Sequence, residues 1–422
     1  MVEASIDREH PVSGDPPTEP PLWRNRSFVL LWASRTISVI GTALGPMALS
    51  FGVLALPSAG IGELSWVLAC QAVPQVLLIL VGGVIADRFS RVTTMIVAEL
   101  VAAGAWGGLA VVVTMNDAPL WMLCGLAATT GIAGAMFVPA YDGVVPEAIA
   151  AAQRQAANGY LRLGLNVARL SGYAIGGGVI VLVGPAAALA ANAVSYVVSA
   201  ALVAFIRLPR RARTGAPNVW GQLAEGAREF FSRQWLWAVT AQFSVVIAAT
   251  SAYAGVLGPA LLSEGVFGAP AWAAIVSAQA LGTISGTVVA IRVRPRYPIR
   301  VAAVAVLGLA MPMATLGVGL PLVVTVVAAF LSGVAMDVFA VLWRTSVQRL
   351  VPLGAQSRVS SWDMLGSLIL APIGLAVAGP LAAVVGVDVA LLGCAVLITV
   401  ATVAVLASPE VRRLRSDDGR AT

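Results

Sequence analysis

Twelve long runs of mostly apolar residues constrain this chain more than any other feature. An α-helix rises 1.5 Å per residue, so about 20 apolar residues span the ~30 Å hydrocarbon core of a membrane. Backbone groups in lipid need internal hydrogen-bond partners, so each run predicts a helix. The chain is 59% hydrophobic and 11% charged, whereas soluble proteins are about a quarter charged. The predicted spans are residues 28–50, 62–86, 93–115, 118–140, 157–183, 185–206, 235–260, 269–291, 299–319, 321–345, 360–382 and 385–407.

The arginines indicate the orientation of these spans. All 26 basic residues are arginine. Arginines fill the tails and the loops on the N-terminal side, while the loops on the other side carry only Glu63, Asp117, Glu264 and Asp388. Because basic loops stay in the cytoplasm, we expect a multi-pass protein of a bacterial inner membrane with both termini cytoplasmic. This distribution also accounts for the net charge of +6 without nucleic acid.

One long connection divides the spans into two sets of six. The basic stretch 207–234 predicts a cytoplasmic linker, with an amphipathic surface helix near 221–231. Residues 23–206 and 235–408 would form two bundles, and 1–22 and 409–422 cytoplasmic tails, the first of them disordered. A single shift aligns Gln75 with Gln279, Gly82 with Gly286 and Arg88 with Arg292, which indicates a duplication. The predicted fold is an all-α integral membrane protein of two pseudo-symmetric six-helix bundles.

Two stretches resemble known transporters. Gly83-Val84-Ile85-Ala86-Asp87-Arg88-Phe89-Ser90-Arg91-Val92 is similar to the motif Gly-x-Leu-Ala-Asp-Arg-x-Gly-Arg-Lys of the major facilitator superfamily, with Ser90 and Val92 as departures. Phe137-Val138-Pro139-Ala140-Tyr141 with Val145-Pro146-Glu147 resembles the enterobactin-exporter and macrolide-efflux branch. The resemblance extends from residue 22 to about 408. It implies twelve helices and secondary active transport by alternating access.

The resemblance implies export of a small amphipathic molecule, such as a drug, antibiotic or siderophore-like metabolite, by proton-coupled antiport. Tyr173 stands where antiporters of the superfamily often have proline, so uptake or facilitated transport stays open, as does a transport-dead sensor or scaffold. We expect a monomer whose partners are this substrate, protons and the lipid bilayer, without nucleic acid. His10 is the only histidine and no nucleophile–base set is visible, so we expect no enzyme, cofactor or metal.

The charged loop after the second span is a candidate gate. Asp87 would meet the positive N-terminal dipole of the eleventh span, and Arg88 and Arg91 would pair with acids at neighbouring helix ends. Contacts of this kind would close the cytoplasmic face and break when it opens. The alternative is a topological anchor without a gating role. The gating candidates are Gly83, Asp87, Arg88, Arg91, Asp142 and Glu147.

Charged residues inside apolar runs are candidates for coupling or substrate binding, because they cost several kcal/mol at the centre of a span. Asp337 is the preferred protonatable group, and a permanent pair with Arg344 or Arg35 is its structural alternative. The amides are expected to hydrogen-bond across helices, and the aromatic rings to pack or to form a wall for a lipophilic ligand. The full candidate set is Asp337, Arg35, Arg169, Glu99, Tyr141, Phe339, Trp343, Gln75 and Gln279.

Overall fold

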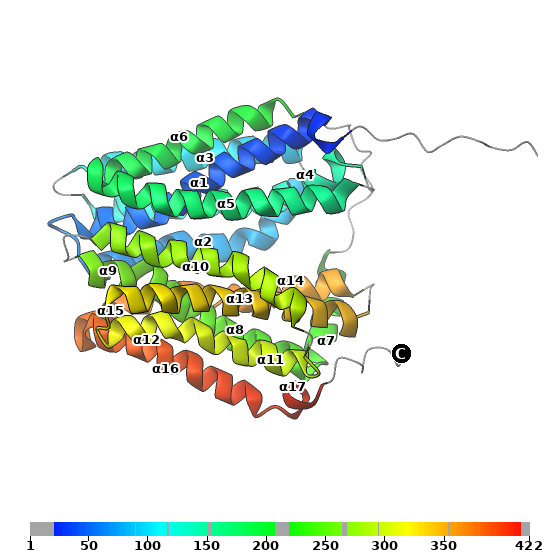
Figure 1. The fold of residues 1–422 in the computed structure, drawn as a ribbon. Coiled ribbons are helices and arrows are strands. Elements are labelled where there is room, and N and C mark those ends of the chain that lie inside the picture. Colours follow the sequence, from blue (N-terminus) through cyan, green and yellow to red (C-terminus); the bar gives the residue numbers. More distant parts are fainter. Residues whose placement is uncertain are drawn as a thin grey trace, which may run out of the picture.

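The structure is a computed structural model of the chain. It describes residues 21–88, 90–115, 118–150, 153–206, 219–263, 268–293, 295–352 and 355–414. Within these ranges, 12 helical segments are long and apolar enough to cross a membrane. This confirms the predicted number of spans. The fold is all-α, with the first six spans in one bundle and the last six in the other (Figure 1).

The N-terminal bundle consists of uninterrupted helices. The side chain of Asn25 accepts a 3.2 Å hydrogen bond from the Phe28 backbone N–H and so caps the first span. Ser90 caps the third span in the same way, through the Thr93 backbone N–H. After a short turn η1 (Leu22–Arg24), the six spans are α1 (Arg26–Leu54), α2 (Ile61–Arg88), α3 (Arg91–Val112), α4 (Leu120–Ala148), α5 (Arg154–Leu182) and α6 (Pro185–Ala204).

Three of the six C-terminal spans change their helical geometry part-way. The seventh comprises α8 (Gln234–Ala252), a π-helical turn η3 (Tyr253–Leu257) and α9 (Gly258–Ser263). The ninth comprises α11 (Pro298–Ala305), a 3-10 turn η4 (Val306–Ala310) and α12 (Met311–Gly317). The eleventh comprises α14 (Gln356–Leu368) and α15 (Ala371–Val385). The remaining spans are α10 (Gly268–Arg292), α13 (Leu322–Leu350) and α16 (Val387–Leu406), followed by the short α17 (Pro409–Arg413).

A short helix in the connection between the bundles packs onto the C-terminal half. This is α7 (Val219–Phe231), within the stretch expected to be the linker. Glu225 forms an ion pair with Arg358 at the start of α14. The rings of Phe231 and Trp362 meet edge to face at 6.1 Å. The linker helix is therefore attached to the eleventh span.

Matched contacts in the two bundles reveal the internal repeat. Gln71 Nε2 on α2 donates to Thr130 Oγ1 on α4 at 2.8 Å, and Gln279 Nε2 on α10 donates to Ser332 Oγ on α13 at 3.2 Å. In each case the hydroxyl residue is followed by a glycine, Gly131 or Gly333, that lies against the backbone carbonyl oxygen of the glutamine. The contacts thus match Gln279 with Gln71, one helical turn away from the Gln75 chosen by sequence alignment.

The two halves meet near one end of the molecule. We call the end where α1 begins and α16 ends the terminal end, which lies to the right in Figure 1. The contacts between halves join α2 to α15, α5 to α10 and α1 to η3 and α9, all near the opposite end. Gly379 N–H donates to Ser65 Oγ at 2.6 Å, and Ser50 Oγ lies 2.9 Å from the Gly255 carbonyl oxygen. These two contacts join the halves directly.

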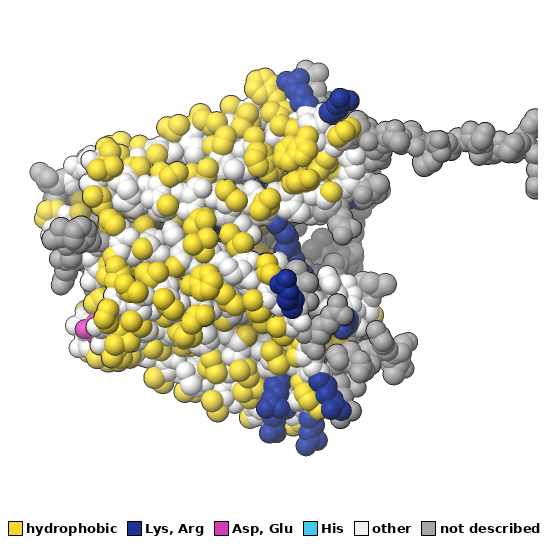
Figure 2. Space-filling model, viewed as in Figure 1, with side chains coloured by type: hydrophobic (Ala, Val, Ile, Leu, Met, Phe, Trp, Pro, Cys, Tyr) yellow, Lys and Arg dark blue, Asp and Glu magenta, His cyan; other side chains and the backbone are white. Residues whose placement is uncertain are grey.

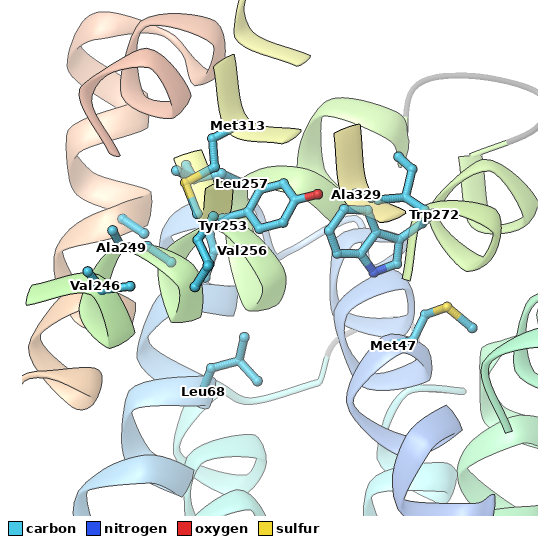
Figure 3. Packing of buried hydrophobic residues seen from close by; sticks show 14 of the residues in the cluster. Met47, Leu68, Val246, Ala249, Tyr253, Val256, Leu257, Trp272, Met313 and Ala329 are labelled. Atoms are coloured by element: carbon cyan, nitrogen blue, oxygen red, sulfur yellow. The ribbon is translucent and has the colours of Figure 1, made fainter. Parts of the chain in front are cut away.

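The buried apolar residues follow the same division. One large cluster runs through both halves, and Figure 3 shows part of it, where Met47 and Leu68 of the N-terminal half lie near Tyr253 and Trp272 of the other half. A second cluster belongs to the terminal end of the N-terminal half alone and includes Phe28. The core is therefore continuous between the halves only towards the opposite end.

The molecular surface is hollowed between the halves at the terminal end. Figure 2 shows this hollow on the right, with basic side chains in and around it. The acidic side chain visible in this view lies at the opposite end. The rest of the visible face is predominantly hydrophobic, as expected of a lipid-facing surface. The structure is thus sealed at one end and open at the other.

Candidate functional site

A guanidinium over two aromatic rings forms the first part of the site, in the N-terminal half. Phe137 and Tyr141 stand four residues apart on α4, which places them on one face, and their rings stack at 5.9 Å with an interplanar angle of 18°. The Arg35 guanidinium carbon on α1 lies 5.1 Å from the Phe137 ring centroid and 5.0 Å from that of Tyr141. Both distances are within cation–π range.

Arg35 has unused hydrogen-bonding capacity. Its Nε atom is buried and has no hydrogen-bond partner within the described ranges, and the same is true of the Tyr141 hydroxyl. Arg169 and Asp142 both lie within electrostatic range of the guanidinium. The structure thus brings Arg35, Tyr141, Asp142 and Arg169, each singled out in the sequence, into one neighbourhood.

A buried carboxylate lies behind this neighbourhood, between α3 and α6. The Glu99 residue is 1% exposed. The Ser199 hydroxyl donates to its Oε1, while Oε2 has no partner in the described part of the chain. Glu99 and Arg35 lie within electrostatic range. Its surroundings therefore suit a counter-charge for Arg35 better than direct substrate contact.

The C-terminal half holds a matching aromatic group beside a carboxylate. Phe339 and Trp343, four residues apart on α13, stack at 6.3 Å and 9°, and Phe243 of α8 stacks on Phe339 at 4.6 Å and 18°. Trp343 Nε1 donates to Asp363 Oδ2 at 2.9 Å, and the Thr240 hydroxyl donates to Oδ1 at 2.6 Å. A cavity of about 60 Å³ is lined by Thr240, Phe243, Phe339, Trp343, Asp363 and Ser367.

Asp337 lies apart from this aromatic group. It stands two residues before Phe339 and so points away from it. Asp337 Oδ2 accepts a 2.7 Å hydrogen bond from Thr287 on α10, and the backbone of Gly286 lies against its side chain. Arg344 is within electrostatic range of Asp337 and of Arg162 on α5. Asp337 is thus held between α10 and α13.

The structure describes only some of the side chains of the candidate gate. Arg91 Nη1 donates to the Gly143 carbonyl oxygen at 2.6 Å and lies 3.1 Å from Glu147 Oε1. This contact joins α3 to α4 within the N-terminal half. The surroundings of Gly83 and the side chains of Asp87 and Arg88 lie outside the described part of the structure.

The other residues singled out in the sequence are dispersed. Gln279 joins α10 to α13 through Ser332. Gln75 is exposed and lies near Gly134 of α4. These contacts hold helices together and lie outside the two aromatic groups.

Asp363 is the principal residue that sequence reasoning missed. It stands as the fourth residue of the predicted span 360–382, where an acid resembles a polar flank. Its partners come from α8 and α13, which no local pattern connects to α14. The sole available signal was an acid placed inside a predicted span. Among the described residues, no group of three His, Cys, Asp or Glu side chains is arranged to hold a metal ion.

Sequence comparison identifies the family. The model of the Major Facilitator Superfamily matches residues 27–369. The chain belongs to the major facilitator superfamily. This confirms the family resemblance and identifies the two halves as those of a membrane transporter.

Superfamily relatives match at moderate identity. The chain is 27% identical to the multidrug efflux pump Tap of Mycobacterium tuberculosis over 407 residues, covering 93% of this chain and 95% of the pump. It is 26% identical to the uncharacterised transporter YfiS of Bacillus subtilis, over 90% of this chain and 93% of that protein. Macrolide efflux protein A of Streptococcus pyogenes is 25% identical over 47% of this chain and 50% of its own length.

Solved structures of superfamily transporters share the fold. The nucleoside transporter NupG aligns with a TM-score of 0.72 at 13% identity, covering 92% of this chain and 100% of that one. A bacterial homologue of the human lysosomal transporter Spinster, in an inward-facing and unoccupied conformation, aligns with a TM-score of 0.69 at 14% identity. That alignment covers 92% of this chain and 98% of the homologue.

Proposed function

We propose that the protein exports small amphipathic molecules from the bacterial cytoplasm by alternating access, in exchange for protons. The observation that carries this proposal is the pair of aromatic faces, one in each half, in a molecule sealed at one end and hollow at the other. Each half offers rings for an apolar surface with a charged side chain in contact with them: Arg35 in the first and Asp363 in the second. Rocking of the halves would expose such a site to each side in turn.

The arginine distribution supports a cytoplasmic terminal end. Basic residues surround the hollow (Figure 2), and basic loops stay in the cytoplasm. With this orientation the described conformation is open to the cytoplasm. It is then the state that takes up a molecule for export.

The names of two relatives support the substrate class. A multidrug efflux pump matches along nearly the whole chain, and a macrolide efflux protein matches about half of it. Drugs and macrolides combine an apolar body with polar groups, which suits aromatic faces flanked by charges. A siderophore-like metabolite shares this character and stays within the proposal.

We propose a gating role for the segment around Asp87, Arg88 and Arg91. Arg91 already joins the ends of α3 and α4, so the end of the N-terminal half would move as a unit against α14. Spin labels at the terminal ends of α2 and α14 test this role. Asp87→Asn should broaden or shift the distance distribution, and an unchanged distribution would contradict the proposal.

Transport in proteoliposomes tests the function. Purified protein is reconstituted, ethidium or erythromycin is supplied on one side, and a proton gradient is imposed in either direction. We expect accumulation on the side from which protons flow, and no accumulation when an ionophore collapses the gradient. Transport in the direction of proton flow would instead support uptake by symport. Equilibration unaffected by the gradient would support facilitated transport, and absence of transport a sensor or scaffold.

A further inference from the structure

The cavity between α8, α13 and α14 contains a carboxylate without a cationic partner. Within the described ranges, the polar contacts of Asp363 are the Thr240 hydroxyl and the Trp343 indole, and neither carries a charge. Asp363 is partly buried, and a carboxylate withdrawn from water is stabilised by a proton or a cation. The cavity of about 60 Å³ leaves room beside the carboxyl for a group a few times the size of one water, which needs roughly 10–15 Å³.

Within the described part of the chain, none of the charged groups on the surrounding elements forms an ion pair with Asp363. Helices α8 and α15 contain no charged residue. On α13, Asp337 accepts from Thr287, and Arg344 is exposed near Arg162. On α14, Arg358 pairs with Glu225 of α7. The remaining charged groups of these elements are Arg349 on α13 and Arg228 and Glu229 on α7, and Glu229 pairs with Arg233.

The hydrogen bonds of Asp363 allow both protonation states. The indole N–H of Trp343 can only donate, so Oδ2 must remain an acceptor. A hydroxyl both donates and accepts. The Thr240 hydroxyl can therefore donate to an ionised Oδ1 or, after rotation, accept from a protonated Oδ1. The proton is thus held at Oδ1, and its loss needs only rotation of one hydroxyl.

The rings that border the cavity suit an organic cation. Phe243, Phe339 and Trp343 form a stack, and Phe339 and Trp343 are 3% and 9% exposed. Cations are attracted to aromatic rings, most strongly where water is excluded. A carboxylate beside such rings combines the two groups that recognise alkylated or aryl ammonium and phosphonium ions.

We infer that this cavity binds the cationic group of a transported molecule, and that its binding releases a proton from Asp363 Oδ1. The Asp363 O–H bond breaks, the proton leaves to water, and the carboxylate keeps the electron pair and faces the cation. Charge in the cavity is thereby balanced before and after exchange. The inference rests on the proposed function, to which it adds a cation as substrate class and Asp363 as the exchanging carboxyl, in place of Asp337.

Binding of tetraphenylphosphonium to purified protein tests the exchange. We expect the wild type to release about one proton per cation bound, measured with a pH indicator in weak buffer, and affinity to rise about tenfold per pH unit while Asp363 is protonated. Asp363→Asn should lower the affinity at least tenfold and remove both the proton release and the pH dependence. The matched control, Asp337→Asn, should keep both.

A chemical measurement on the wild type guards against a variant that does not fold. Dicyclohexylcarbodiimide modifies protonated carboxyls in apolar surroundings, and mass spectrometry locates the adduct. Tetraphenylphosphonium should reduce modification of Asp363 at least fivefold, while that of Glu99, buried in the other half, should not change. Equal modification of Asp363 with and without the cation overturns the inference.

The outcomes separate this inference from the proposed function. If the wild type does not bind tetraphenylphosphonium, or binds it without proton release, the cation site is wrong even where ethidium or erythromycin is exported. Conversely, proton release on binding without export in proteoliposomes would sustain the site and overturn the proposed direction of transport.

Discussion

The aromatic pairs of the two halves share a geometry and differ in charge. Phe137 and Tyr141 on α4 stack four residues apart, and so do Phe339 and Trp343 on α13. These are matched helices, each joined to its neighbour by a glutamine–hydroxyl contact. The first pair lies beneath the Arg35 guanidinium, whereas Trp343 of the second donates to the carboxylate of Asp363.

The difference shows how a duplicated fold acquires polarity. The stacked rings lie on equivalent helices, so the duplication accounts for their geometry. The charges come from helices that are not equivalent: α1 supplies Arg35, and α14 of the eleventh span supplies Asp363. A molecule between the halves would thus meet the Arg35 guanidinium on one side and the Asp363 carboxyl on the other.

The largest effect is expected when the charge of Arg35, beside the aromatic pair of the N-terminal half, is reversed. Arg35→Glu would bury a carboxylate against ring faces, near Glu99 and Asp142, with Arg169 as the nearby cation. We expect a loss of about 3–5 kcal/mol in unfolding free energy, seen as a lower thermal midpoint in detergent. Arg35→Lys is the control and should lose much less. Equal midpoints for both variants would show that the charge at this face has little structural role.

Trp343→Phe removes the indole donor to Asp363 and keeps an aromatic ring in the stack. A hydrogen bond contributes about 0.5–1.5 kcal/mol between neutral groups and about 1.5–3 kcal/mol to a charged group. We therefore expect the smaller loss at a pH where Asp363 holds its proton and the larger loss where it is ionised. The control is Tyr141→Phe, at the matched position of the other half. Its hydroxyl has no partner among the described residues, so its stability should stay near that of the wild type.

A pair of double-mutant cycles compares the rings directly. Arg35→Gln with Phe137→Leu should give a coupling free energy of about 1 kcal/mol, the scale of a partly buried cation–π contact. Asp363→Asn with Phe339→Leu should couple by less than about 0.5 kcal/mol, since the carboxylate contacts Trp343 instead. Equal coupling free energies in the two halves would show that the charged groups interact with the two aromatic pairs in the same way.

The smallest effect is expected at the end of the N-terminal half. The side chains of Arg91 and Glu147 are 21% and 20% exposed, and pairs of this kind contribute about 0.2–1 kcal/mol. A cycle of Arg91→Gln and Glu147→Gln, followed by thermal unfolding at low and high salt, measures it. A coupling above 2 kcal/mol, or one insensitive to salt, would mean that the pair does more than join α3 to α4.

The sequence predicted the spans well because length and apolarity determine them. Arg35 and Glu99 could also be identified, since each charge stands out in an apolar run, and Asp142 could be identified as an acid just beyond the end of a predicted span. What brings Asp363 to Trp343 is the packing of three helices, which spacing along the chain does not contain. The rule that a charge inside an apolar run is a candidate singled out Asp337. That residue lies against α10 and not beside the aromatic group. Sequence alignment pairs Gln279 with Gln75, one helical turn away from the Gln71 that makes the matching contact, because an Ala- and Gly-rich sequence offers several similar alignments.

The glycine contacts at the opposite end have an electrical consequence. A side chain at Gly379 would collide with the Ile61 carbonyl oxygen, and one at Gly177 with the Ala273 side chain, so the helices of the two halves approach closely there. With water in the hollow at the other end, most of the membrane potential would drop across this thin seal. Moving one charge through 100 mV is worth about 2.3 kcal/mol. The outward step of the cation and the inward step of the proton would each cross this field. A one-for-one exchange moves no net charge, so the pH difference would drive the net exchange while voltage acts only on its separate steps.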